Sequence, residues 1–102
     1  MTRDEAASIL AELLADRTRL WRSSHFDDVM EQRDYTMLDV WKLIRERNIE
    51  TEPAFEQSHG PGDHVVRLLG RATNGRKTRL VLGLRRVGPS VAITIIDIRG
   101  AR

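Results

Sequence analysis

The hydrophobic residues change their spacing near the middle of this chain, and that change limits the fold more than any other feature. Up to about residue 47 they recur at i, i+3 and i+4, as on one face of an α-helix. Beyond residue 48 they alternate with polar residues, as in strands with one buried face. Helices followed by antiparallel strands indicate an α+β fold, and 102 residues suffice for one domain with a modest core.

The first part is expected to contain an additional N-terminal helix within 1–20 and a helical hairpin over 24–47. Each helix starts at a residue whose side-chain oxygen can accept a hydrogen bond from a free backbone amide of the first turn. The expected caps are Thr2 with Glu5, Ser24, and Thr36 with Asp39.

Residues 49–98 are expected to form a four-stranded antiparallel sheet, with Pro53 confining the first strand to an edge. A two-residue Asn74-Gly75 turn would mix charge into the apolar face, so a three-residue loop with a left-handed Gly75 is preferred. A two-residue Gly88-Pro89 turn is expected to join the last two strands. These loops pair Val66 with Leu82, Leu68 with Leu80, Leu84 with Ile93, and Leu82 with Ile95. The helices are expected to cover the face that carries Val66, Leu68, Leu80, Leu82, Leu84, Ile93 and Ile95.

Charge is distributed unevenly along the chain. Residues 1–57 contain 8 Lys/Arg and 13 Asp/Glu, a net charge of −5, whereas residues 58–102 contain 9 and 2, a net charge of +7. This asymmetry suggests either that one half faces an anion or that the surface is merely rich in arginine. Because guanidinium groups bind phosphate through paired hydrogen bonds, the second sheet face is a candidate phosphate surface. Its candidate residues are Arg67, Arg71, Arg79, Arg85 and Thr94.

Composition excludes several classes of protein. With no cysteine, disulfides and thiolate metal sites are impossible. Two Trp, one Tyr and two Phe are the aromatic residues, and none is expected on the basic face, which argues against a base-stacking platform there. Trp21 and Trp41 are expected to be anchors in the core or at its edge. The N-terminus has no signal-peptide pattern and no apolar run is long enough for a membrane span, so a cytoplasmic protein is expected.

Histidines supply the candidate acid–base and metal groups. His25, in the first turn of the second expected helix, has an imidazole that titrates near neutral pH, although a single histidine at a helix start is more often structural. His59, Asp63 and His64 are weak candidate metal ligands, but GPGD within this segment is better explained as a turn. We therefore expect neither a metal nor a cofactor.

Three stretches carry a resemblance to a known family: SSHFDDVMEQRDYTMLDVWKLIRERNIE, HVVRLLGRATNGRKTRLVLGLRR and VAITIIDI. Together they resemble a bacterial domain family of unknown function that is grouped with the RelE/ParE-like toxin superfamily. The resemblance spans about residues 22–98. Phe26 stands where the family usually has alanine, and Asn48 replaces its usual glycine. The matching positions are His25, Met30, Arg33, Val40, Ile49, Gly70, the Asn74-Gly75 turn and Thr94.

The resemblance implies a RelE-like fold and, as one function, a metal-independent ribonuclease toxin paired with an antitoxin. By motif it carries over His25, Arg33 and Thr94 as catalytic residues. His25 would be the general base or acid for attack of a 2′-hydroxyl on the adjacent phosphate, and Thr94 would donate a hydrogen bond to that phosphate. Arg67, Arg79 or Arg85 would neutralise the developing charge.

Two other functions remain open at this stage. A non-catalytic member of the same fold would bind a protein partner or nucleic acid, and the uneven charge suits such a complex equally well. A toxin tip cut from a larger secreted protein would have an immunity protein in place of an antitoxin. The capping pattern directly after Met1 favours a free-standing chain over this third class. The sequence does not indicate an oligomeric state.

Overall fold

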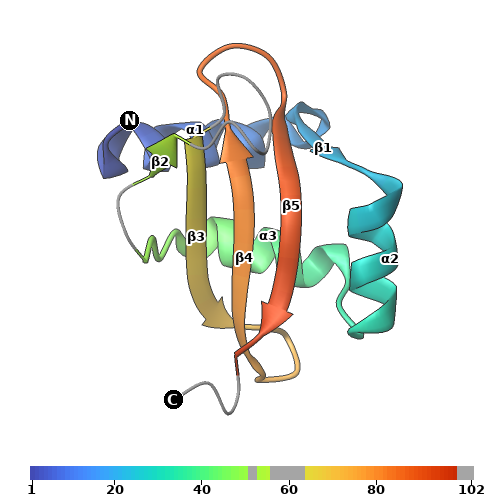
Figure 1. Cartoon of the computed structure of the whole chain (residues 1–102). Helices are drawn as coiled ribbons and strands as arrows, with labels where there is room; N and C mark the ends of the chain where they lie inside the picture. Colours follow the sequence, from blue (N-terminus) through green and yellow to red (C-terminus); the bar gives the residue numbers. More distant parts are fainter. Residues whose placement is uncertain (51–52, 56–63, 99–102) are drawn as a thin grey trace.

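The computed structural model describes residues 1–50, 53–55 and 64–98 of the chain. Its helices and strands follow the expected order, with helices before most of the strands (Figure 1). The helices are α1 (Arg3–Ala15), the short 3₁₀ turn η1 (Arg17–Arg19), α2 (Ser24–Gln32) and α3 (Met37–Glu46). The cap of α2 is Ser23 rather than the expected Ser24, because the Ser23 hydroxyl accepts the hydrogen bond from the Phe26 backbone amide. The strands are β1 (Leu20–Arg22), β2 (Ala54–Phe55), β3 (His64–Arg71), β4 (Lys77–Leu84) and β5 (Ser90–Asp97).

The sheet differs from the expected four antiparallel strands. Among the described residues it has five strands in the order β1-β5-β4-β3-β2, and β1 runs parallel to β5 while the other pairs are antiparallel. The extra strand arises because α1 ends at Asp16, which then caps η1 through a hydrogen bond from the Thr18 backbone amide. Leu20 enters the core and draws the following residues alongside β5. Three residues are too few to produce an alternating pattern, so no pattern of hydrophobic residues predicts this strand.

The sheet and the helices form two layers. Figure 1 shows α1 and α3 crossing behind the strands and α2 standing beside β5, so the two helices expected as a hairpin flank different parts of the sheet. We call the side of the sheet away from α1 and α3 the outer face. Fully buried side chains of the core include Leu10, Leu13, Phe26, Val40, Leu43, Ile44, Leu68, Leu80, Leu82, Leu84 and Ile95.

The register of the β3–β4 hairpin is as expected. Val66 pairs with Leu82 and Leu68 with Leu80, and Gly75 has a φ of 89°, in the left-handed region that the turn requires. Gly70 allows α3 to approach β3, because a Cβ atom at this position would lie 2.6 Å from Leu43 Cδ2.

The expected register of β4 and β5 is wrong. Leu82 pairs with Ala92 rather than Ile95, and Leu80 pairs with Ile95. Five residues, 85–89, separate the strands instead of two, and a bulge leaves Ile93 without a pairing partner. Ala92 therefore takes the buried position that the alternation assigned to Ile93. A bulge of this kind leaves the hydrophobic pattern of an isoleucine-rich strand unchanged, so the sequence does not reveal it.

The expected edge strand over residues 49–56 forms in part. Ile49 makes an isolated antiparallel bridge to Leu68, and β2 pairs Ala54 with Val65. Residues 51, 52 and 56 lie outside the described residues, as does the expected loop after them.

Asp39 joins α3 to the β3–β4 turn. Its Oδ2 accepts a hydrogen bond from the Thr36 backbone amide, which completes the expected capping box. Its Oδ1 accepts two more, from the backbone amide and the hydroxyl of Thr73, both at 2.8 Å. Burial raises the pKa of Asp39, but the hydrogen bonds from Thr73 and Thr36, with the charge of Arg76, outweigh burial and hold the pKa below 3.8.

Replacing Asp39 with asparagine tests this junction. The asparagine of Asp39→Asn has one acceptor oxygen, whereas the carboxylate accepts from Thr36 with one oxygen and from Thr73 with the other. The free energy of unfolding at pH 7 should therefore fall by roughly 1–3 kcal/mol. Because the folded pKa is depressed, the carboxylate stabilises the wild type above pH 3.8, and that contribution is lost as pH falls through the folded pKa. Urea unfolding across this range should show a weaker pH dependence in the variant; equal slopes would contradict the assignment.

Candidate functional site

Two of the residues carried over by resemblance meet at the edge of β5. Arg33, which ends α2, donates from Nη1 to the Ile95 carbonyl at 2.8 Å and to Thr94 Oγ1 at 3.4 Å. β1 pairs only with residues 90–92 of β5, so the β5 edge from residue 93 onward has no pairing with β1. Arg33 satisfies a carbonyl on that edge, so its contact with Thr94 has a structural role as well as any functional one.

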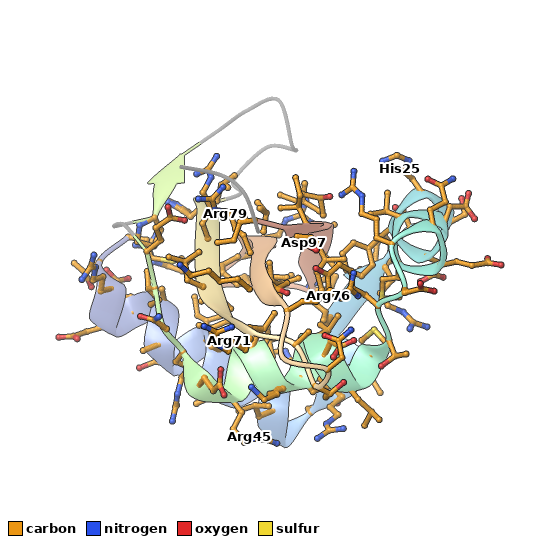
Figure 2. All side chains as sticks on the ribbon, turned by 90° about the horizontal axis from the view of Figure 1, so that it is seen from below. His25, Arg45, Arg71, Arg76, Arg79 and Asp97 are labelled. Atoms are coloured by element: carbon orange, nitrogen blue, oxygen red, sulfur yellow. The ribbon has the colours of Figure 1, made fainter. Side chains whose placement is uncertain are left out.

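The imidazole of His25 lies apart from the arginines expected to bind phosphate. His25 is exposed, and Figure 2 shows it on the outer surface of α2, across the molecule from Arg79. Arg79 belongs to β4, and β5 lies between β4 and α2. Therefore these side chains do not gather into one catalytic site in this structure.

Arg79 is held by an acidic residue of the same chain. Its Nε donates to Glu50 Oε2 at 2.8 Å and its Nη2 donates to Glu50 Oε1 at 2.9 Å. Both oxygens of the Glu50 carboxylate accept hydrogen bonds from the guanidinium group. Two oxygens of a phosphate would bind the same group in the same way. Glu50 reaches this position because its backbone amide donates to the Arg67 carbonyl, which fixes the segment against β3.

The remaining expected phosphate-binding residues are distributed over two regions. Arg67 and Arg71 alternate with the buried residues of β3 and so share the outer face with Arg79. Arg71 donates to the Gly75 carbonyl at 2.9 Å, and Arg67 is also engaged in a contact. Arg85 lies beyond the end of β4, where it lines a small hollow with Ile9 and other residues near α1.

The charge asymmetry of the sequence is partly neutralised inside the molecule. Besides the Arg79–Glu50 pair, Arg86 Nη2 lies 2.8 Å from Glu5 Oε2, so that two acidic residues of the first half pair with two arginines of the second. The hydrogen bond from Arg86, followed by that from the Thr2 amide, lowers the pKa of Glu5. Intramolecular pairing therefore accounts for part of the pattern that suggested an anionic partner.

Trp21 was expected in the core or at its edge but is exposed. Its side chain is 64% accessible, whereas Trp41 is buried as expected. Leu20 points into the core, so Trp21 points to the outer face, level with its partner Val91 on β5. Further along β5, Ile96 on the same face is 38% exposed. We call Trp21, Val91 and Ile96 the β5 strip; it was not predicted because β1 itself was not.

Arg76 is a second residue that the sequence did not indicate. Its guanidinium group lies over the Tyr35 ring at 4.1 Å and donates to the carbonyls of Arg33 and Asp34 at 2.8 and 2.7 Å. Asp97 lies 4.0 Å away. Figure 2 shows Arg76 between the sheet and the end of α2. Arg76 therefore serves to attach α2 to the hairpin.

The structure adds little on metals and membranes. His59 and Asp63 lie outside the described residues, and the described ranges contain no group of three potential metal ligands. None of the helices in those ranges has the length and the apolar run that crossing a bilayer requires.

Comparison with protein-family models, with curated proteins and with solved structures found no match for this chain. A function must therefore be argued from the residues and their geometry.

A double-mutant cycle measures how strongly Arg79 is held. With Arg79→Gln, Glu50→Gln and the double variant, the coupling free energy from urea unfolding should be about 1 kcal/mol, because the pair is bidentate and only about one-third exposed. The single-contact Lys42–Glu46 pair on α3 is the control and should couple by about 0.3–0.5 kcal/mol. Equal coupling in the two pairs would show that Arg79 is more available than its geometry indicates.

Proposed function

We propose that this chain is a non-catalytic binding module that takes a protein partner at the β5 strip. One observation carries the proposal: Arg79 is bound to Glu50, while the exposed Trp21 lies on the same face of the sheet. Tryptophan and arginine are the residues that most often dominate the binding energy of protein interfaces. An exposed tryptophan beside other apolar side chains is therefore better explained by a protein partner than by phosphate.

The surroundings of the strip suit a partner with an acidic rim. Arg33 is exposed and lies beside Thr94, between the positions of Val91 and Ile96 along β5. Its Nη1 is committed to β5, and its positive charge favours a carboxylate on whatever covers the strip. A small partner protein encoded beside this chain, such as an antitoxin or an immunity protein, fits that description. In keeping with the sequence, the complex would be cytoplasmic.

The second candidate is a RelE/ParE-like toxin that cleaves RNA without a metal. The contact between Arg33 and Thr94 favours it, because these two residues are carried over by resemblance and lie 3.4 Å apart in the structure. His25, on the helix that Arg33 ends, would then act as base or acid once RNA bound between α2 and the outer face. The same neighbouring protein would serve as its antitoxin.

Inducible expression and an RNA-cleavage assay in EDTA separate the two candidates. For a binding module, wild type and His25→Ala should both permit growth, and neither should cleave RNA, because no catalytic group acts. Growth arrest by the wild type, with cleavage that His25→Ala reduces by about 10²-fold or more, would replace the binding module with the ribonuclease.

Co-expression with the product of the neighbouring gene tests the β5 strip. Trp21→Ser should weaken the complex by about thirtyfold or more, as expected for an interface residue worth about 2 kcal/mol. Leu38→Ser is the matched control, because Leu38 is also an exposed large apolar residue, 72% accessible, but lies on α3. Titration calorimetry would give both affinities. A complex that tolerates Trp21→Ser, or is weakened equally by Leu38→Ser, would contradict the assignment.

A further inference from the structure

A hollow of about 240 Å³ lies at the end of the sheet where β3 meets β4 and where the chain leaves β5. Its size suits a small molecule or one end of a chain, because sites for drug-sized ligands usually exceed about 300 Å³. The hollow is lined by Asn48, Leu69, Gly70, Arg71, Lys77 and Ile98.

Two positively charged residues are cross-strand neighbours at this hollow. Arg71 and Lys77 are directly opposed partners in the β3–β4 ladder, and both are exposed. Like charges in this arrangement destabilise a sheet. Arg71 contributes one donor to the Gly75 carbonyl, and within the described part of the chain neither residue forms an ion pair with a carboxylate. A bound anion would relieve the repulsion between these two side chains.

The carboxylate of Glu46 is nearby but does not neutralise Arg71 and Lys77. Glu46 lies on the helix side of Gly70, where its Oε1 would be 2.8 Å from an added Cβ atom. Its Oε2 accepts from Lys42 Nζ at 2.8 Å, and Lys42 also donates to the Arg71 carbonyl. Glu46 is therefore already engaged by a cation on the far side of β3.

The other lining residues are largely apolar. Leu69 precedes Arg71 by two positions and shares its face of β3. Ile98 lies next to Lys77, because its backbone amide donates to the Lys77 carbonyl at 3.0 Å. The side-chain amide of Asn48 adds a neutral donor at the rim. The lining contains no aromatic ring, so a nucleobase would find no stacking partner among these residues.

We propose that this hollow binds an aliphatic carboxylate, with the anionic group between Arg71 and Lys77 and the hydrocarbon part against Leu69 and Ile98. The same chemistry is available from a free short-chain acid and from the C-terminus of a peptide that ends in an aliphatic residue. The hollow reaches the end of β5 through Ile98, two residues beyond Ile96, but the inference uses no residue of the β5 strip and so does not depend on the proposed function.

NMR titration of the ¹⁵N-labelled full chain tests the ligand class. 4-Methylpentanoate should produce saturable shifts of the Leu69, Gly70, Lys77 and Ile98 amides in the millimolar range. The neutral 4-methylpentanamide lacks the anionic group, and inorganic phosphate lacks the hydrocarbon part. Each should therefore bind at least about tenfold more weakly than 4-methylpentanoate. No saturable shift, or equal binding of the neutral amide or of phosphate, would overturn the proposal.

A peptide ending in leucine, with a free or an amidated C-terminus, distinguishes the sources. Tighter binding of the free-carboxylate peptide than of the acid would assign the site to chain termini, and equal or tighter binding of the acid would assign it to a small molecule. Preference for the amidated peptide would overturn the proposal, because the charge would then have no role.

Variants separate binding from folding. Arg71→Gln and Lys77→Gln should each weaken 4-methylpentanoate by about tenfold or more. Arg45→Gln should leave its affinity unchanged, because Arg45 is exposed on the far side of α3 from the sheet (Figure 2). Lys77→Glu should abolish binding yet raise the melting temperature by a few degrees, because it replaces a like-charge pair with an opposite one. Retained binding in Lys77→Glu would overturn the proposal.

Discussion

The turn between β3 and β4 holds α2 and α3 in place. Thr73, in the turn, donates two hydrogen bonds to Asp39 at the start of α3, and Arg76, just after it, donates two to carbonyls at the end of α2. Thr78 continues the network: its hydroxyl donates to the Arg76 carbonyl, so the Tyr35 hydroxyl is the donor in the buried contact between Tyr35 and Thr78. The path from α2 to α3, where Asp34 has a φ of 58°, is thus fixed by one turn of the sheet.

The position of α2 has consequences for the outer edge of the sheet. Because the end of α2 is attached to the β3–β4 hairpin, Arg33 reaches the Ile95 carbonyl on β5. This carbonyl lies on the part of β5 that β1 does not pair with. An unpaired strand edge tends to recruit other chains, and a side chain that occupies its acceptors reduces that tendency. The same arrangement leaves the face of β5 accessible beside Trp21. A partner would therefore bind side chains on the outer face more readily than the backbone of this edge.

The outer face divides into two regions with different chemistry. On the β1–β5 side it carries the β5 strip, with a large exposed aromatic group. On the β3–β4 side it carries opposed cations beside an aliphatic hollow. Between them lies Arg79, which pairs with Leu69 of the hollow and Ile96 of the β5 strip and whose charge is neutralised by Glu50. A continuous phosphate-binding surface, as the clustering of arginines in the sequence suggested, would need Arg79 to exchange Glu50 for the ligand.

Local patterns in the sequence determined α1, α2 and α3, the caps at Thr2 and Thr36, and the β3–β4 register, because capping boxes and a glycine turn act over a few residues. The sequence also placed Arg67, Arg71 and Arg79 on one face, since alternation along a strand fixes the face. Only the tertiary structure decided that β1 adds a parallel strand, that a bulge at Ile93 shifts β5, and that Glu50 binds Arg79. Each of these depends on which distant residues come into contact, and residue spacing carries no information about that.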